Sequence, residues 1–123
     1  SRELTDLLNR IREPFNVNSI AQAAAIAVLQ DRAYYNNIAR KINAQRQYLQ
    51  DSLKKLRLDF VNSATNFVLV RVPRRAAGVS KKLLKRGVIV RDMGFWGMKD
   101  YFRVTIGSAK ENQRFIKLLK EIL

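Results

Sequence analysis

Two arginines in the second half of the chain have the residue type and the position to bind a small anion. Residues 101–106 have the pattern of a strand, in which Phe102, Val104 and Ile106 share one face and Arg103 lies on the other. A planar guanidinium on the polar side of a half-buried strand suits bidentate binding of a carboxylate or phosphate, with an ordinary exposed strand arginine as the alternative. Arg91 ends another expected strand. If the hairpin register places it opposite Arg103, the pair would clamp an anion from two sides, but the length of the connection leaves that register open.

The composition limits the other chemistry that the chain could perform. It contains no Cys and no His, which excludes disulfides, thiolate metal sites and histidine-dependent nucleophiles or general bases. No metal site is expected, and catalysis by the chain alone would need carboxylates, Lys, Tyr or Arg. The formal net charge of +14, from 24 basic and 10 acidic residues, points to an anionic partner.

A basic nucleic-acid-binding module is an alternative function of a different class. Between Asp59 and Asp92 there is no acidic residue, and aromatic residues follow directly, as in proteins that bind single strands through charge and stacking. The basic residues in this stretch are Arg71, Arg74, Arg75, Lys81, Lys82, Lys85, Arg86 and Arg91. The signature of the RNA-recognition motif is absent, and a solvated basic surface is the simplest interpretation of the charge.

The first part of the chain is expected to be helical. A helix from the first residues stops near Glu13, because Pro14 disfavours helical geometry in the residue before it. A second helix starts at Ser19, whose spacing to Gln22 fits a capping box, and its nearly continuous apolar run predicts burial on most sides. Residues 33–56 have the periodicity of a long amphipathic helix.

The rest of the chain alternates strands and helices. Strands are predicted at residues 58–61, 66–72, 88–91 and 101–106, and a helix at residues 79–86 that Gly87 ends. Residues 94–97 form a loop, and a last helix starts at Ala109 behind a capping box of Ser108 and Glu111. The order β-α-β-β-α predicts an α+β fold, with a small, partly antiparallel sheet and helices packed on one face.

Residues 1–123 are therefore expected to form a single domain, with a helical segment over 1–56 and a sheet-and-helix layer over 57–123. The helical spacing of the first residues, without an initiator Met, suggests a piece of a longer polypeptide. No apolar run approaches the ~20 residues of a membrane span, and no basic segment followed by an apolar stretch opens the sequence, so a cytoplasmic protein without a membrane partner is expected.

Five segments in the same order resemble the C-terminal small domain of histidinol-phosphate aminotransferase, and the resemblance covers essentially the whole chain. They are residues 12–18 (REPFNVN), 21–25 (AQAAA), 64–67 (ATNF), 87–92 (GVIVRD) and 102–108 (FRVTIGS) followed by Glu111 and Asn112. The related threonine-phosphate decarboxylases are also similar. The segment Arg-Val-Thr-Ile-Gly followed by Glu-Asn resembles the aminotransferase more closely.

This resemblance implies a fold-type I, pyridoxal-phosphate-dependent transaminase of histidine biosynthesis. Such an enzyme transfers an amino group between L-histidinol phosphate and 2-oxoglutarate, in the cytoplasm and as a homodimer. By the resemblance, Arg103 corresponds to the arginine that holds the anionic end of the substrate and Arg91 to a second arginine at its phosphate. Asn66 would line the approach to the active site.

The resemblance also implies what this chain lacks. The Schiff-base lysine, the aspartate at the pyridine nitrogen and the phosphate cup of the cofactor belong to the large domain, upstream of residue 1. No catalytic or cofactor-binding residue is therefore expected here, and no bound pyridoxal phosphate. The chain would supply substrate-anion-binding arginines to its own large domain and be inactive alone.

Overall fold

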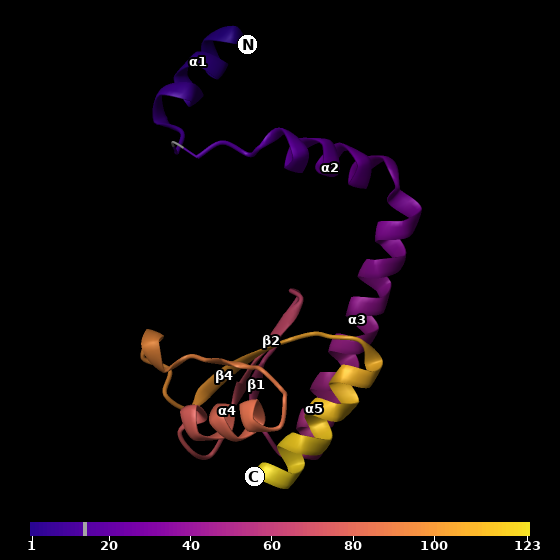
Figure 1. Ribbon diagram of the computed structural model, residues 1–123, viewed down its shortest axis with the longest axis vertical. Coiled ribbons are helices and arrows are strands. Elements are labelled where there is room, and N and C mark those ends of the chain that lie inside the picture. Colours follow the sequence, from indigo (N-terminus) through magenta and orange to yellow (C-terminus); the bar gives the residue numbers. More distant parts are fainter. Residues whose placement is uncertain (14) are drawn as a thin grey trace. The chain divides into compact units, whose positions relative to one another are not determined.

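The computed structural model describes residues 1–13 and 15–123, which form two compact units, Ser1–Asn36 and Asn37–Leu123 (Figure 1). The first unit contains α1 (Arg2–Ile11) and α2 (Ser19–Gln30). Helix α1 begins where the Ser1 hydroxyl accepts the Leu4 N–H, and it ends at Ile11, close to the predicted stop. Pro14, which was expected to cause that stop, lies outside the described residues.

Helix α2 differs from the sequence-based expectation in two ways. Its cap is Asn18 rather than Ser19, because the Asn18 side chain reaches the Ala21 N–H at 2.8 Å, while Gln22 donates to the Val17 carbonyl at 2.7 Å. None of its residues is buried within the described chain, and Ile20 is 80% exposed. The predicted burial is thus wrong for this chain, because an apolar helix is buried only where another element covers it.

The second unit is a small sheet with helices. Helix α3 (Arg32–Lys55) runs across the boundary between the units, and the elements that follow are β1 (Phe60–Val61), β2 (Phe67–Arg71), α4 (Ala76–Lys85), β3 (Arg91–Asp92), the short 3-10 helix η1 (Gly94–Trp96), β4 (Tyr101–Thr105) and α5 (Ala109–Ile122). None of the helices among the described residues has the length and apolar character needed to cross a membrane.

One hydrophobic core joins a single face of the sheet to three helices. The strand order is β1-β2-β4-β3, and all three pairings are antiparallel. Every second residue of β2 and β4 faces this core, which Leu49 and Leu53 of α3 complete together with buried residues of α4 and α5. The core contains Leu49, Leu53, Leu58, Val68, Val70, Val72, Ala76, Val79, Leu83, Phe102, Val104, Ile106, Phe115 and Leu119. The predicted α+β fold, with helices on one face of a small sheet, is confirmed.

The strand predicted at residues 88–91 lies later in the chain, at Arg91–Asp92. Gly87 has φ +75°, and the Val88 N–H donates back to the Leu83 carbonyl at 3.0 Å. These residues therefore close the C-terminus of α4 and enter the sheet only at Arg91. Helix α4 also begins three residues earlier than predicted, at Ala76, whose N–H donates to the Lys99 carbonyl at 2.9 Å.

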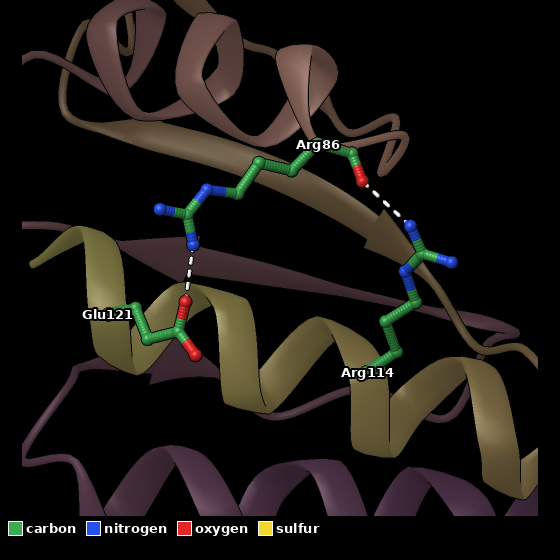
Figure 2. Close-up of polar contacts among 3 residues, drawn as sticks. All are labelled: Arg86, Arg114 and Glu121. Carbon is green, nitrogen blue, oxygen red and sulfur yellow. Dashed lines mark hydrogen bonds and ion pairs between the residues drawn. The ribbon is translucent and has the colours of Figure 1, made fainter.

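Two arginine side chains connect α4 to α5 (Figure 2). Arg86, at the C-terminus of α4, forms an ion pair with Glu121 of α5. In the opposite direction, Arg114 of α5 donates from Nη2 to the Arg86 carbonyl at 2.8 Å. A cation beside the last carbonyls of a helix compensates both their unused acceptors and the helix dipole. The capping box predicted at Ser108 and Glu111 is confirmed at the other end of α5.

Candidate anion-binding site

Arg91 and Arg103 are direct neighbours on the face of the sheet that the helices do not cover. In the hairpin of β3 and β4, Arg91 lies opposite Arg103, and on the other side of β4 Arg103 lies opposite Leu69 of β2. Side chains of directly opposed residues project to the same face, with Cβ atoms about 5 Å apart. The register that the sequence left open therefore brings the two guanidinium groups to one place.

Each of the two guanidinium groups lies over an aromatic ring. The Arg103 Cζ is 5.0 Å from the centre of the Phe67 ring, and the Arg91 Cζ is 5.2 Å from the centre of the Trp96 ring. Within the described part of the chain, neither arginine has a carboxylate partner or a side-chain hydrogen bond. Their N–H donors are thus available to a ligand.

A surface pocket of about 230 Å³ lies at the same place, lined by Ile89, Val90, Arg91, Arg103 and Thr105. Arg91 and Arg103 are both exposed in this chain, so their N–H donors can meet a ligand without first breaking an ion pair or a hydrogen bond among the described residues. Two adjacent cations with parallel N–H donors can bind either a carboxylate or a phosphate. Chemically, the arrangement has the groups needed to bind a small anion.

Asn66 is not part of this pair. It precedes β2, it is exposed, and its carbonyl accepts the Ile106 N–H at 2.8 Å. Ile106 lies three residues beyond Arg103 and belongs to the core, so the backbone pairing places Asn66 at the end of the sheet rather than beside the two guanidinium groups.

The sequence did not identify Phe67 and Trp96 as partners of the arginines. Phe67 pairs with Thr105, which makes it the diagonal neighbour of Arg103 across the strands. Trp96 belongs to η1, in the connection between β3 and β4. Phe67 lies two residues before Leu69, the residue opposite Arg103, and therefore on the same face of the sheet. This spacing could have identified Phe67 only if the strand register had been known.

Some of the aromatic and basic residues that suggested nucleic-acid binding are not available for it. Phe102, one of the aromatics that suggested stacking on bases, is completely buried in the core. Arg86 is paired with Glu121, and the lysines of α4 lie on its exposed side. This distribution does not support the nucleic-acid-binding alternative.

Comparison with known proteins identifies the family of this chain. The family model for aminotransferases of class I and II matches residues 1–119. The chain belongs to this family. It is 51% identical to histidinol-phosphate aminotransferase 1 of Cupriavidus pinatubonensis, over 98% of this chain and 33% of that protein. It is 47% identical to the histidinol-phosphate aminotransferase of Methylobacillus flagellatus, over 98% of this chain and 32% of that protein.

A solved structure of the same family agrees. The crystal structure of histidinol-phosphate aminotransferase from Sinorhizobium meliloti, in complex with pyridoxal-5'-phosphate, matches with a TM-score of 0.79 and 28% identity, over 94% of this chain and 33% of that one. The resemblance inferred from the five sequence segments is therefore confirmed. This chain spans about a third of the length of the curated relatives it matches.

Proposed function

We propose that this chain is the C-terminal domain of a histidinol-phosphate aminotransferase, and that Arg91 and Arg103 bind the anionic end of its substrate. The observation that carries the proposal is the cross-strand pair of these arginines, which have no carboxylate partner among the described residues, in a chain whose curated relatives carry that name. The threonine-phosphate decarboxylase alternative is not favoured by these relatives, and neither is a nucleic-acid-binding module.

The pair explains how one site serves both half-reactions. L-histidinol phosphate carries a phosphate ester where an amino acid has its α-carboxylate, and both groups accept parallel hydrogen bonds from guanidinium forks. Arg103 and Arg91 thus bind and orient L-histidinol phosphate in one half-reaction and 2-oxoglutarate, which leaves as glutamate, in the other. Asn66, at the end of the sheet, would line the approach of the substrate.

We expect the large domain, rather than this chain, to hold pyridoxal phosphate. All of its lysines are exposed, whereas a Schiff-base lysine needs a desolvated pocket or a charged neighbour that lowers its pKa. Asn112 is the buried polar residue of the described core, and its side chain is fully engaged in hydrogen bonds. In the proposed enzyme, pyridoxal phosphate is the electron sink and is held by the large domain, so this chain alone should not transaminate.

A cytoplasmic location and a homodimer built with the large domain belong to the same proposal. Multi-angle light scattering of the complete enzyme tests the homodimer. A monomer at concentrations where the enzyme is active would contradict it.

The decisive test is Arg103→Ala in the complete enzyme. Loss of one partner of a charge pair in a closed site costs about 2–5 kcal/mol, so kcat/KM for L-histidinol phosphate should fall at least about thirtyfold and up to several thousandfold, with the cofactor absorbance unchanged. Arg71→Ala is the matched control, because Arg71 is an exposed arginine of β2 that lies opposite Tyr101, outside the pair. Wild-type kcat/KM in Arg103→Ala would refute the assignment.

A further inference from the structure

We propose that Trp96 and Phe67 are positioning residues that hold the guanidinium groups of Arg91 and Arg103 side by side, and that this ring-held pair prefers a phosphomonoester dianion to a carboxylate. The inference rests on the proposed function, because it concerns the same site. It assigns a role to two aromatic side chains that contact the arginines rather than the substrate.

The cross-strand position of Arg91 and Arg103 brings two positive charges close together. Like charges directly opposite each other on neighbouring strands repel, and Arg91 and Arg103 occupy such a cross-strand position. No acidic side chain of the described residues pairs with either of them. Instead, the face of an aromatic ring, which carries partial negative charge, lies 5.0 Å from the Arg103 Cζ and 5.2 Å from the Arg91 Cζ.

The position of Trp96 is fixed by the hairpin that also carries Arg91. At the start of η1, the Asp92 carboxylate accepts the Gly94 N–H at 3.2 Å. At its end, Gly97 adopts φ +80° and donates its N–H to the Gly94 carbonyl at 3.0 Å. The turn therefore fixes the backbone from which the half-exposed Trp96 ring reaches Arg91.

Phe67 is held in a similar way by the central strand pair. It lies opposite Thr105 on β4 and is partly buried, so its ring has packing contacts besides the one with Arg103. The two rings approach the pair from different elements, β2 and η1. Each ring removes rotamer freedom from one long arginine side chain before a ligand arrives, and a preorganised side chain loses less entropy on binding.

The two positive charges of the site favour a phosphomonoester dianion over a carboxylate. Two neighbouring cations without a counter-charge are neutralised by one phosphomonoester dianion, whereas a single carboxylate group leaves one positive charge of the pair uncompensated. A carboxylate still fits the guanidinium forks. The site therefore accepts both substrates but binds the phosphorylated one more tightly, and the difference depends on both arginines being held in place.

Kinetics of the complete enzyme test the positioning role. Trp96→Leu keeps apolar bulk but removes the ring, and should raise KM for L-histidinol phosphate about two- to fivefold with kcat little changed, as expected for a lost exposed cation–π contact. Phe67→Leu should act in the same direction, and Trp96→Phe should restore most of the affinity. Phe95→Ala is the control, because Phe95 is a 90% exposed ring of the same turn that packs edge-on against Trp96, with ring centres 5.3 Å apart, and is not part of either cation–π contact of the described residues.

The KM values distinguish loss of arginine positioning from a general disturbance of the structure. KM for 2-oxoglutarate should rise less than KM for L-histidinol phosphate in Trp96→Leu. Equal KM values in Trp96→Leu and Phe95→Ala would overturn the proposal, and so would a Trp96→Phe variant as impaired as Trp96→Leu.

Trp96 also gives a test that does not depend on enzyme activity, because it is the single tryptophan of this chain. Inorganic phosphate, added to the chain at constant ionic strength and about pH 8 where it is a dianion, should change the Trp96 emission saturably. Acetate should need a higher concentration for the same change, and Arg91→Gln should abolish the response to phosphate. A response that is absent, or equal in Arg91→Gln, would overturn the inference.

The two experiments distinguish failure of the inference from failure of the proposed function. If the complete enzyme does not transaminate L-histidinol phosphate but the emission of Trp96 still reports phosphate, the proposed function is wrong and the anion site stands. If the enzyme is active and Trp96→Leu has wild-type kinetics, the positioning role is wrong and the proposed function stands.

Discussion

Replacing Asn112 with alanine should lower the free energy of unfolding of this chain by about 2–4 kcal/mol. Asn112 is only 2% exposed, and its side chain joins three segments. Its Nδ2 donates to Gln45 Oε1 at 3.0 Å and to the Gly107 carbonyl at 2.9 Å, and its Oδ1 accepts the Gly107 N–H at 3.0 Å. Each such hydrogen bond contributes roughly 1 kcal/mol net, and alanine leaves partly buried partners unsatisfied.

Urea denaturation followed by far-ultraviolet circular dichroism measures this effect on the 123-residue chain. Gln113→Ala is the matched control, because Gln113 is the next residue of α5 and is exposed, so its variant should stay within about 0.5 kcal/mol of wild type. Asn112→Asp keeps the size and one acceptor but loses both donors. It should be destabilised at neutral pH and recover partly in acid, where the carboxyl group can donate once. An Asn112→Ala variant as stable as Gln113→Ala would refute the reasoning.

Two further variants test the ends of α4 and α5. The Ser108 hydroxyl and then its N–H hold the pKa of Glu111 below the ordinary 4.5, so this stabilisation is complete above that value and is lost as the pH falls through the lowered pKa. In Ser108→Ala, the free energy of unfolding should therefore decrease less in acid than it does in the wild type. Urea denaturation at several pH values measures this, and a variant with the same pH dependence as the wild type would contradict the prediction. Arg114→Ala should cost about 0.5–1.5 kcal/mol by removing the hydrogen bond to the Arg86 carbonyl, in contrast to exposed Lys117→Ala, measured by the same denaturation.

The parts of the fold that the sequence predicted are those governed by local chemistry. Alternation in residues 101–106 identified β4 and the faces of Phe102 and Arg103, because a core on one side of a strand requires apolar residues at every second position. The spacing of Ser108 and Glu111 likewise identified the start of α5, since a capping box is complete within four residues.

The parts that the sequence could not predict depend on contacts between distant segments or on competition at a boundary. The apolar residues after Gly87 have strand character, but the Val88 N–H closes α4 instead, which delays β3. The burial of α2 was predicted from composition alone, and composition does not say which element covers an apolar helix. The aromatic partners of Arg91 and Arg103 depend on strand register, and local periodicity contains no information on register.

The strand register links the position of the arginine pair to the packing of the core. Val68 lies opposite Val104 and Val70 opposite Phe102, and these buried pairs fix β4 against β2. A slip of one residue would move Arg103 into the core, at a cost far above the value of any surface contact, because a buried unpaired charge is strongly disfavoured. The apolar packing on one face of β4 therefore holds Arg103 on the other face, where it meets Arg91, and the geometry of the candidate anion site follows from the packing of the core.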